Sequence, residues 1–388
     1  MTIFPRPLLG MPLCVIVLLA CQKKEIPPLL TLSIQTENEL DTLEKKAIAV
    51  SYEAPIDGYK KYAARAKLLS HSNQSKKSSF DIELEKKAVL GEVAEEDDWV
   101  LLAVDDIAAY VQHEWCKTLL HRINTANLIP RGAFVQVNFN ANDLGLYYLQ
   151  EEINGGKLDV KKRDPLSIIL KNPPFFQQYR TDEASQTDNY YQQIFPKKSP
   201  QNLAQYMSRL EDFLWTSSDE TFEKEVTQWF DLDNVMDWHL LQLLLTNGKK
   251  TPQSSFLYKT STEAPFRIAL TDYPLPLFLP KKITKENITF DLPNHILLKR
   301  LLQTNARRYR QGLKNRWKLI IEEQLFTEEW INQFFEKQLS PSLWEAVKKD
   351  KSHQNHSKEW TLVEKELLDI KNFLKLKRSM MDTFLEKY

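Results

Sequence analysis

Glycine is scarce in this chain, with nine among 388 residues, and neither G-x-G-x-x-G nor G-x-x-x-x-G-K-[ST] occurs. Rossmann and P-loop proteins use these motifs because glycine lets the backbone approach the phosphates of a nucleotide. The G-x-S-x-G serine elbow is absent too. The zinc motif H-E-x-x-H fails because Lys117 stands where the second histidine would be. Any nucleotide site in this chain must therefore hold phosphates without the usual glycine loops.

The chain also lacks net charge, because 52 lysine and arginine residues balance 52 aspartate and glutamate residues. Proteins that bind nucleic acid usually present an excess of basic side chains to the phosphates. This balance therefore argues against a nucleic-acid partner. Hydrophobic residues make up 42% of the sequence, which is enough for a substantial core in one large domain or two smaller ones.

The first twenty residues have the layout of a secretory signal. Arg6 and the amino terminus give a weakly positive start, and an uncharged run from Leu8 to Ala20 follows. A positive start, a short apolar stretch and a small residue before the cut are the parts of a signal peptide. A membrane-spanning helix needs about 20 apolar residues, and this run is shorter. We therefore expect residues 1–20 to be removed from an exported protein.

The last residues of this leader and the one that follows resemble the bacterial lipoprotein box, in which a cysteine thiol is acylated before cleavage: Leu18-Leu19-Ala20-Cys21. The resemblance implies that lipid on Cys21 holds the chain on a membrane of the bacterial cell envelope, at the outer membrane or cell surface. The alternative is an ordinary signal with a chance cysteine. Since Cys14 leaves with the leader, only Cys116 remains, which excludes an intramolecular disulfide and a zinc site built on cysteine.

Apolar residues alternate with other residues along much of the first half of the mature chain, and this period of two predicts strands. The predicted strands lie at 30–34, 48–50, 64–68, 80–84 and 166–170, with a continuous apolar strand at 99–104 and a hairpin between 135 and 149. Helical spacing runs from Ile107 to Leu120.

Past Pro196 the pattern changes to helices, at 203–213, at 231–246 and from His295 onwards, with one strand pair at 256–258 and 266–270. We therefore divide the chain into a leader at 1–20, a tether at 21–29, a strand-rich lobe at 30–196 and a helical lobe at 197–388. Strands followed by helices indicate an α+β protein.

Several stretches in this order resemble the CotH family of atypical protein kinases, the spore-coat type. The stretches include Asp98-Trp99-Val100-Leu101-Leu102-Ala103, Pro130-Arg131-Gly132, Gly145-Leu146-Tyr147-Tyr148, Phe195-Pro196 and Asn315-Arg316-Trp317. The chain looks like a divergent member carried on a bacterial lipoprotein. The resemblance implies an atypical protein-kinase-like fold over nearly all of the mature chain.

The resemblance also implies phosphoryl transfer from ATP with Mg²⁺ or Mn²⁺. That reaction needs cations on the phosphates, oxygen ligands on the metal and a carboxylate beside the acceptor hydroxyl. Lys76 and Lys77 match the family's basic pair and are candidates for phosphate contact; the alternative is an exposed, charged strand end. Glu151 matches a family glutamate that pairs with a lysine or the metal; the alternative is a solvated strand end.

This sequence departs from the family pattern in its second half. Active members show Asn-x-Asp after the apolar helix, whereas here Asn247 is followed by Lys249, which replaces a carboxylate with an ammonium. An asparagine before the short strand becomes Ser254, a weaker magnesium ligand. Asn247, Lys249 and Ser254 remain candidates for nucleotide contact. Trp-Asp-Phe-Asp becomes Thr271-Asp272-Tyr273-Pro274, so Asp272 is the candidate catalytic residue and metal ligand.

These departures favour a degenerate kinase, meaning a pseudokinase or a module that binds a nucleotide or a protein partner at the envelope. The second hypothesis is an active kinase that phosphorylates Ser or Thr of a surface protein, using Asp272, Glu151 and Asp231 or Asp233. Both of these last aspartates are more simply helix N-caps. The third hypothesis is a non-catalytic adhesion or structural protein.

Overall fold

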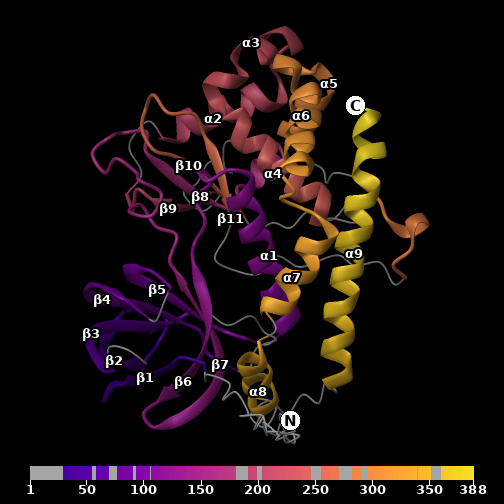
Figure 1. Cartoon of the computed structure of the whole chain (residues 1–388). Helices are drawn as coiled ribbons and strands as arrows, with labels where there is room; N and C mark the ends of the chain where they lie inside the picture. Colours follow the sequence, from indigo (N-terminus) through magenta and orange to yellow (C-terminus); the bar gives the residue numbers. More distant parts are fainter. Residues whose placement is uncertain are drawn as a thin grey trace, which may run out of the picture.

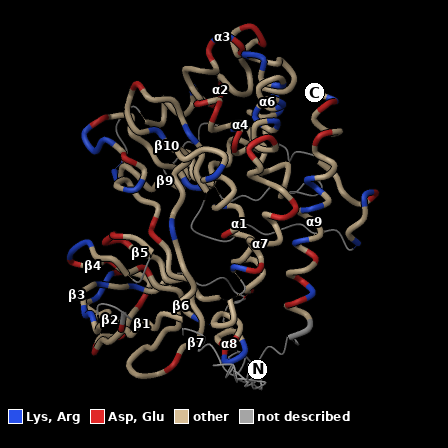
Figure 2. The backbone as a smooth tube through the Cα atoms, in the orientation of Figure 1, with Lys and Arg blue, Asp and Glu red and all other residues tan. Residues whose placement is uncertain are grey.

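The computed structural model describes residues 29–54, 58–69, 77–90, 93–104, 106–180, 191–198, 203–245, 255–270, 282–290, 295–338, 340–350 and 360–388. A group of strands forms the lower part of the molecule, and helices with a second, smaller sheet form the upper part (Figure 1). The long helix near the carboxyl terminus runs beside both parts. Lysine and arginine are interspersed with aspartate and glutamate over both (Figure 2).

The lower part is a closed barrel with the strand order β1-β2-β3-β4-β5-β7-β6. Neighbouring strands are antiparallel except β1 and β6, which run parallel and close the barrel. Closure pairs the backbone groups that an open sheet would leave along its edges. The bounds are β1 (Thr31–Gln35), β2 (Lys46–Ala54), β3 (Gly58–Leu68), β4 (Phe80–Val89), β5 (Glu95–Ala103), β6 (Gly132–Phe139) and β7 (Asn142–Glu151).

The barrel interior is an apolar core of its own. Leu32 and Ile34 of β1 and Val135 and Val137 of β6 are completely buried, as is Trp99 of β5. Successive side chains of a strand point to opposite faces, so a sequence of period two fills the interior with alternate residues. The outer face of β7 instead contributes to the larger core of the upper part.

Helix α1 (Ile107–Ile123) follows β5 and packs on the outer face of the barrel. The side chain of Asp106 caps its first turn by accepting hydrogen bonds from the backbone N–H groups of Ala108 and Ala109. The ring of Tyr110 lies 5.3 Å from that of Tyr148 on β7. On its other sides α1 contacts the helices of the upper part, so it links the two cores.

The second sheet has four antiparallel strands in the order β11-β10-β8-β9. The bounds are β8 (Ile168–Lys171), β9 (Gln192–Phe195), β10 (Ser255–Lys259) and β11 (Arg267–Leu270). This sheet therefore combines strands from both sides of Pro196, where the sequence was divided into two lobes. The division itself stays a prediction.

The helices of the upper part surround α4, which is buried on nearly every side. A helix that is apolar all round is expected at the centre of a helical body. The bounds are α2 (Leu203–Trp215), α3 (Asp219–Trp229), α4 (Leu232–Leu245), α5 (Ile296–Thr304), α6 (Tyr309–Glu322), α7 (Glu328–Gln338), α8 (Pro341–Asp350) and α9 (Trp360–Glu386), with short 3-10 turns at Pro174–Phe176, Lys285–Asn287 and Ala306–Arg308.

The structure confirms the strand-rich first half, the helical second half, the hairpin of β6 and β7 and the strand pair of β10 and β11. Closure of the barrel, β9 and α3 were not predicted. Among the described residues, no helix combines the length and the apolar character needed to cross a membrane. The leader, the tether up to residue 28 and Cys21 lie outside the described residues.

Candidate functional site

The candidate site of the helical half is framed by α4, β10 and β11. The first residue of β10, Ser255, pairs with the last residue of β11, Leu270. Asn234 of α4 fixes β11 from the side, because its Nδ2 donates to the Ile268 carbonyl (3.0 Å) and its Oδ1 accepts from the Ile268 N–H (2.6 Å). The start of β10 and the end of β11 therefore lie side by side in the sheet.

The segment that precedes β10 and the segment that follows β11 carry most of the residues that the family resemblance singles out. Asn247, Lys249 and Ser254 lie between α4 and β10, and Asp272 follows β11. All four are outside the described residues, as is Lys76. Their assigned roles stay predictions.

Asp237 anchors α4 within this frame. Its carboxylate is completely buried and receives Nε and Nη2 of Arg316 at 2.5 and 2.9 Å. The side-chain amides of Asn124 and Asn127, which follow α1, donate to the same carboxylate at 3.2 and 3.0 Å. Four donors satisfy the buried charge, as a buried ion requires. Asp237 thus joins α4 to α6 and to the end of α1.

Lys77, which precedes β4, lies in an ion pair with the helical half. Its Nζ is 2.5 Å from Oδ1 of Asp350, the last residue of α8, and the two side chains are 10% and 6% exposed. The backbone N–H of Leu146 on β7 donates to the same oxygen (3.1 Å). Lys77 is therefore not the exposed strand end of the alternative interpretation, and its ammonium is balanced by a carboxylate.

Glu151 ends β7, where the chain leaves the barrel, and its side chain is 1% exposed. The carboxylate accepts from the backbone N–H and guanidinium of Arg131 (2.7 and 3.0 Å) and from Nζ of Lys157 (2.5 Å). Burial disfavours the charged form, but these hydrogen bonds outweigh it and lower the pKa of Glu151. Glu151 pairs with a lysine and is not a solvated strand end.

Lys77 and Glu151 do not meet in one site. The Lys77–Asp350 pair lies against Leu146, and Glu151 is five residues further along the same strand. At about 3.4 Å per residue, these positions are about 17 Å apart.

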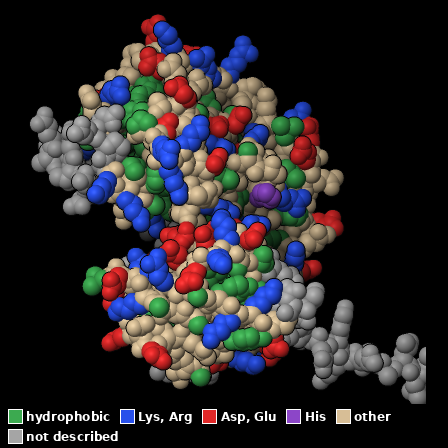
Figure 3. Space-filling view, turned by 90° about the vertical axis from the view of Figure 1, so that its left-hand side faces the viewer, with side chains coloured by type: hydrophobic (Ala, Val, Ile, Leu, Met, Phe, Trp, Pro, Cys, Tyr) green, Lys and Arg blue, Asp and Glu red, His purple; other side chains and the backbone are tan. Residues whose placement is uncertain are grey.

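Acidic and basic side chains gather at the narrow waist between the barrel and the upper body, as Figure 3 shows.

A further charged cluster, centred on Lys117 of α1, was not predicted from the sequence. Its Nζ is buried and lies 2.6 Å from Oε1 of Glu114, 2.8 Å from the Tyr148 hydroxyl and 3.3 Å from Oε1 of Gln150. Burial lowers the pKa of Lys117, and Glu114 opposes this effect. The available signal was a lysine one turn after a glutamate in the predicted helix.

No group of three or more His, Cys, Asp or Glu side chains in the described part of the chain is arranged to hold a metal ion. Cys116 is a buried free cysteine, and burial raises the pKa of its thiol. Since Asp272 is not among the described residues, its role as metal ligand stays a prediction.

These features define an α+β protein with a closed barrel, a second small sheet and a helical body around a buried helix. The sequence model of the CotH kinase protein family matches residues 70–381. The match covers most of the chain, which therefore belongs to the CotH kinase family. A comparison with curated proteins found no match.

Proposed function

We propose that this chain is a lipid-anchored envelope protein of the CotH kinase family that binds a nucleotide or a protein partner without efficient phosphoryl transfer. The observation that carries the proposal is Lys249, which stands where the resemblance leads us to expect the carboxylate beside the acceptor hydroxyl. Losing a general base costs about 10²–10⁴ in rate. Pro274 in place of a second carboxylate adds to this loss.

The geometry around the site supports a kinase-like fold with an altered centre. Asn234 and Asp237 hold α4 against β11 and α6, which keeps the frame of the site intact. By contrast, Lys77 is paired with Asp350, and Glu151 with Arg131 and Lys157. Lys77 and Glu151 are the two described residues that the resemblance assigns to ATP or its metal. Both are already paired with charged side chains of the protein, and these pairs stabilise the fold.

Labelled ATP tests the loss of activity. We expect the purified mature domain, with Mg²⁺ or Mn²⁺, to transfer no more label than a heat-denatured sample. The variant Lys249→Asp restores the carboxylate and should raise transfer, whereas Lys250→Asp makes the same charge change one residue later and should not. Robust transfer by the unaltered chain that is lost in Asp272→Ala would overturn the proposal in favour of an active kinase.

The active-kinase alternative relies on Asp272, Glu151 and an aspartate at the start of α4. Asp231 accepts a hydrogen bond from the Asn234 backbone N–H (3.2 Å), which is the geometry of a helix cap, and it lies 3.4 Å from Arg267.

Calorimetry with a non-hydrolysable ATP analogue tests the third hypothesis, a protein that binds no nucleotide. Failure to bind it would favour a non-catalytic adhesion or structural protein.

The anchor is proposed on the leader sequence alone. Mass spectrometry of the amino-terminal peptide from membranes should find acyl chains on Cys21. Cys21→Ser should release the chain from the membrane fraction, and Cys14→Ser, a matched change within the leader, should not. Retention of the Cys21→Ser protein would contradict a lipid anchor while leaving the family assignment untouched.

A further inference from the structure

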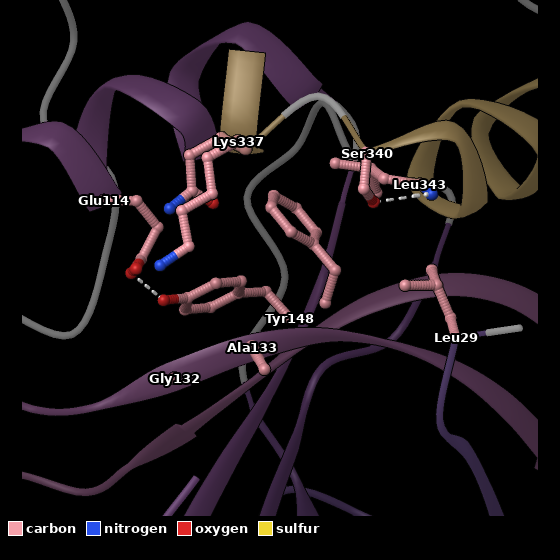
Figure 4. Close-up of a pocket in the computed structure, with 10 residues that line it drawn as sticks. Leu29, Glu114, Gly132, Ala133, Tyr148, Lys337, Ser340 and Leu343 are labelled. Carbon is pink, nitrogen blue, oxygen red and sulfur yellow. Dashed lines mark hydrogen bonds between the residues drawn. The ribbon is translucent and has the colours of Figure 1, made fainter. Parts of the chain in front are cut away.

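A pocket of about 240 Å³ lies between the outer face of the barrel and the adjacent ends of α7 and α8. Its walls come from α1, β6, β7 and the two helices, and Leu29 borders it ahead of β1. Figure 4 shows Glu114 and Lys337 at one end and Leu29 and Leu343 at the other. The pocket therefore has a charged end and an apolar end, and no step of the proposed kinase chemistry uses it.

The charged end has one acidic and one basic group. Oε1 of Glu114 accepts from Lys117 and from the Tyr148 hydroxyl, whereas Oε2 has no hydrogen-bond partner among the described residues. The Glu114 side chain keeps 15% of its surface exposed. Lys337, at the end of α7, is exposed and forms no ion pair within the described part of the chain. A carboxylate oxygen and an ammonium are thus both available to a ligand.

The pair of Glu114 and Lys117 gives the carboxylate a fixed position. Lys117 is buried and Tyr148 is completely buried, so neither can turn away to solvent. Gly132 makes room for this arrangement, because a Cβ added there would lie 2.6 Å from the Tyr148 ring. The carboxylate is therefore held in place before any ligand arrives, which reduces the ordering cost of binding.

The size of the pocket limits what can bind. Its volume equals that of about eight water molecules in liquid water. Sites for drug-sized ligands are larger, at roughly 300–1,000 Å³. A nucleotide would exceed it and would bring several negative charges next to Glu114. A simple amine would leave Lys337 unused, and a simple carboxylate would leave Glu114 unused.

We propose that this pocket binds a free α-amino acid with an apolar side chain. In such a molecule the ammonium and the carboxylate are attached to the same carbon atom, which matches two opposite charges at one end of the pocket. The ammonium pairs with Oε2 of Glu114 and the carboxylate with Lys337. The side chain packs on Phe134 and reaches towards Leu29 and Leu343. This site is independent of the proposed nucleotide function.

Calorimetry on the purified full chain with four probes tests the ligand class: L-phenylalanine, L-alanine, phenethylamine and 3-phenylpropionate. We expect L-phenylalanine to bind best, because the other three lack the apolar group, the carboxylate or the ammonium. A hydrogen bond to a charged group corresponds to a factor of at least about ten in affinity. Equal binding of L-phenylalanine and either single-charge probe, or no binding of any probe, would overturn the proposal.

Variants then place the ligand in this pocket. Lys337→Met should weaken L-phenylalanine binding at least about tenfold and leave phenethylamine binding unchanged. Lys318→Met removes another exposed lysine, on α6, and should change neither. Glu114→Gln should weaken the binding of both L-phenylalanine and phenethylamine, with circular dichroism as the check that the variant folds. Unchanged L-phenylalanine binding in Lys337→Met would place the ligand elsewhere and refute the site.

Discussion

The barrel and the helical body solve the placement of polar groups in different ways. In the barrel, inward positions are apolar and ion pairs such as Arg65–Glu83 lie on the outside. The helical body buries its charges: Asp237 with Arg316, and the ammonium of Lys377 against the Leu243 carbonyl (2.9 Å). A strand can expose one of its two faces to water, whereas a central helix such as α4 is buried on nearly every side. Each polar group there needs a partner inside the protein.

This comparison predicts its largest effect at Asp237. Replacing it by alanine leaves Arg316 without its carboxylate and should lower the free energy of unfolding by about 3–5 kcal/mol. Glu83→Ala removes the ion pairs with Arg65 and Lys45 on the outside of the barrel, where the Arg65 and Glu83 side chains are 57% and 36% exposed, and should cost at most about 1 kcal/mol. Chemical denaturation measures both. Equal losses of unfolding free energy in the two variants would contradict the proposed difference between the barrel and the helical body.

Acid should destabilise the helical body through its buried histidines. Burial lowers the pKa of His113, His239 and His295 from about 6.5 to about 3. Because the unfolded chain then binds more protons, stability is fully present above pH 6.5 and is lost as the pH falls towards 3. The three histidines together contribute about 4 kcal/mol per pH unit within this window.

Urea denaturation at pH 7.5 and 5.5 measures this loss. The variant His295→Phe, which keeps a ring stacked on Phe176 at 4.2 Å, should reduce the slope by about a third. The described barrel strands contain no histidine. A slope that is unchanged in this variant would contradict the contribution assigned to His295.

The Lys77–Asp350 pair connects the two parts and tests whether they are coupled. Lys77→Met leaves Asp350 buried without its cation and should cost about 3 kcal/mol. The partly exposed Lys67 of β3 lies 3.7 Å from Asp81, which keeps Lys45 as a closer partner at 2.8 Å, so Lys67→Met should cost less than about 1 kcal/mol. Hydrogen exchange should show faster exchange in both β4 and α8 for Lys77→Met alone. Faster exchange in β4 only would mean that the barrel and α8 unfold separately.

Two buried tryptophans give the smallest and most closely matched contrast. Nε1 of Trp317 donates to the Asp382 carboxylate (2.6 Å), and Nε1 of Trp99 in the barrel donates to the Glu96 carbonyl (3.1 Å). Since hydrogen bonds to charged groups contribute about 1.5–3 kcal/mol and neutral ones about 1, Trp317→Phe should cost more than Trp99→Phe. Thermal unfolding ranks the two variants, and the reverse order would contradict the comparison.

Local patterns predicted much of the fold and little of the site. Strand β10 and helix α4 were visible because apolar period and turn residues depend on neighbours in the chain. The pairing of Lys77 with Asp350 spans 273 positions, and no pattern near either residue reports it. The same holds for Glu151, because no local pattern marks Arg131 and Lys157 as the partners of its carboxylate.

By itself the sequence determined the order of most strands and helices, though not β9 or α3, and also the α+β class and the resemblance to the CotH family, since each depends on residue types and their spacing. Tertiary structure alone decided that β1 closes the barrel on β6, that the second sheet draws strands from both halves, and that Glu114 and Lys337 line the same pocket. These are contacts between distant segments, fixed by packing and by the need to pair every buried polar group.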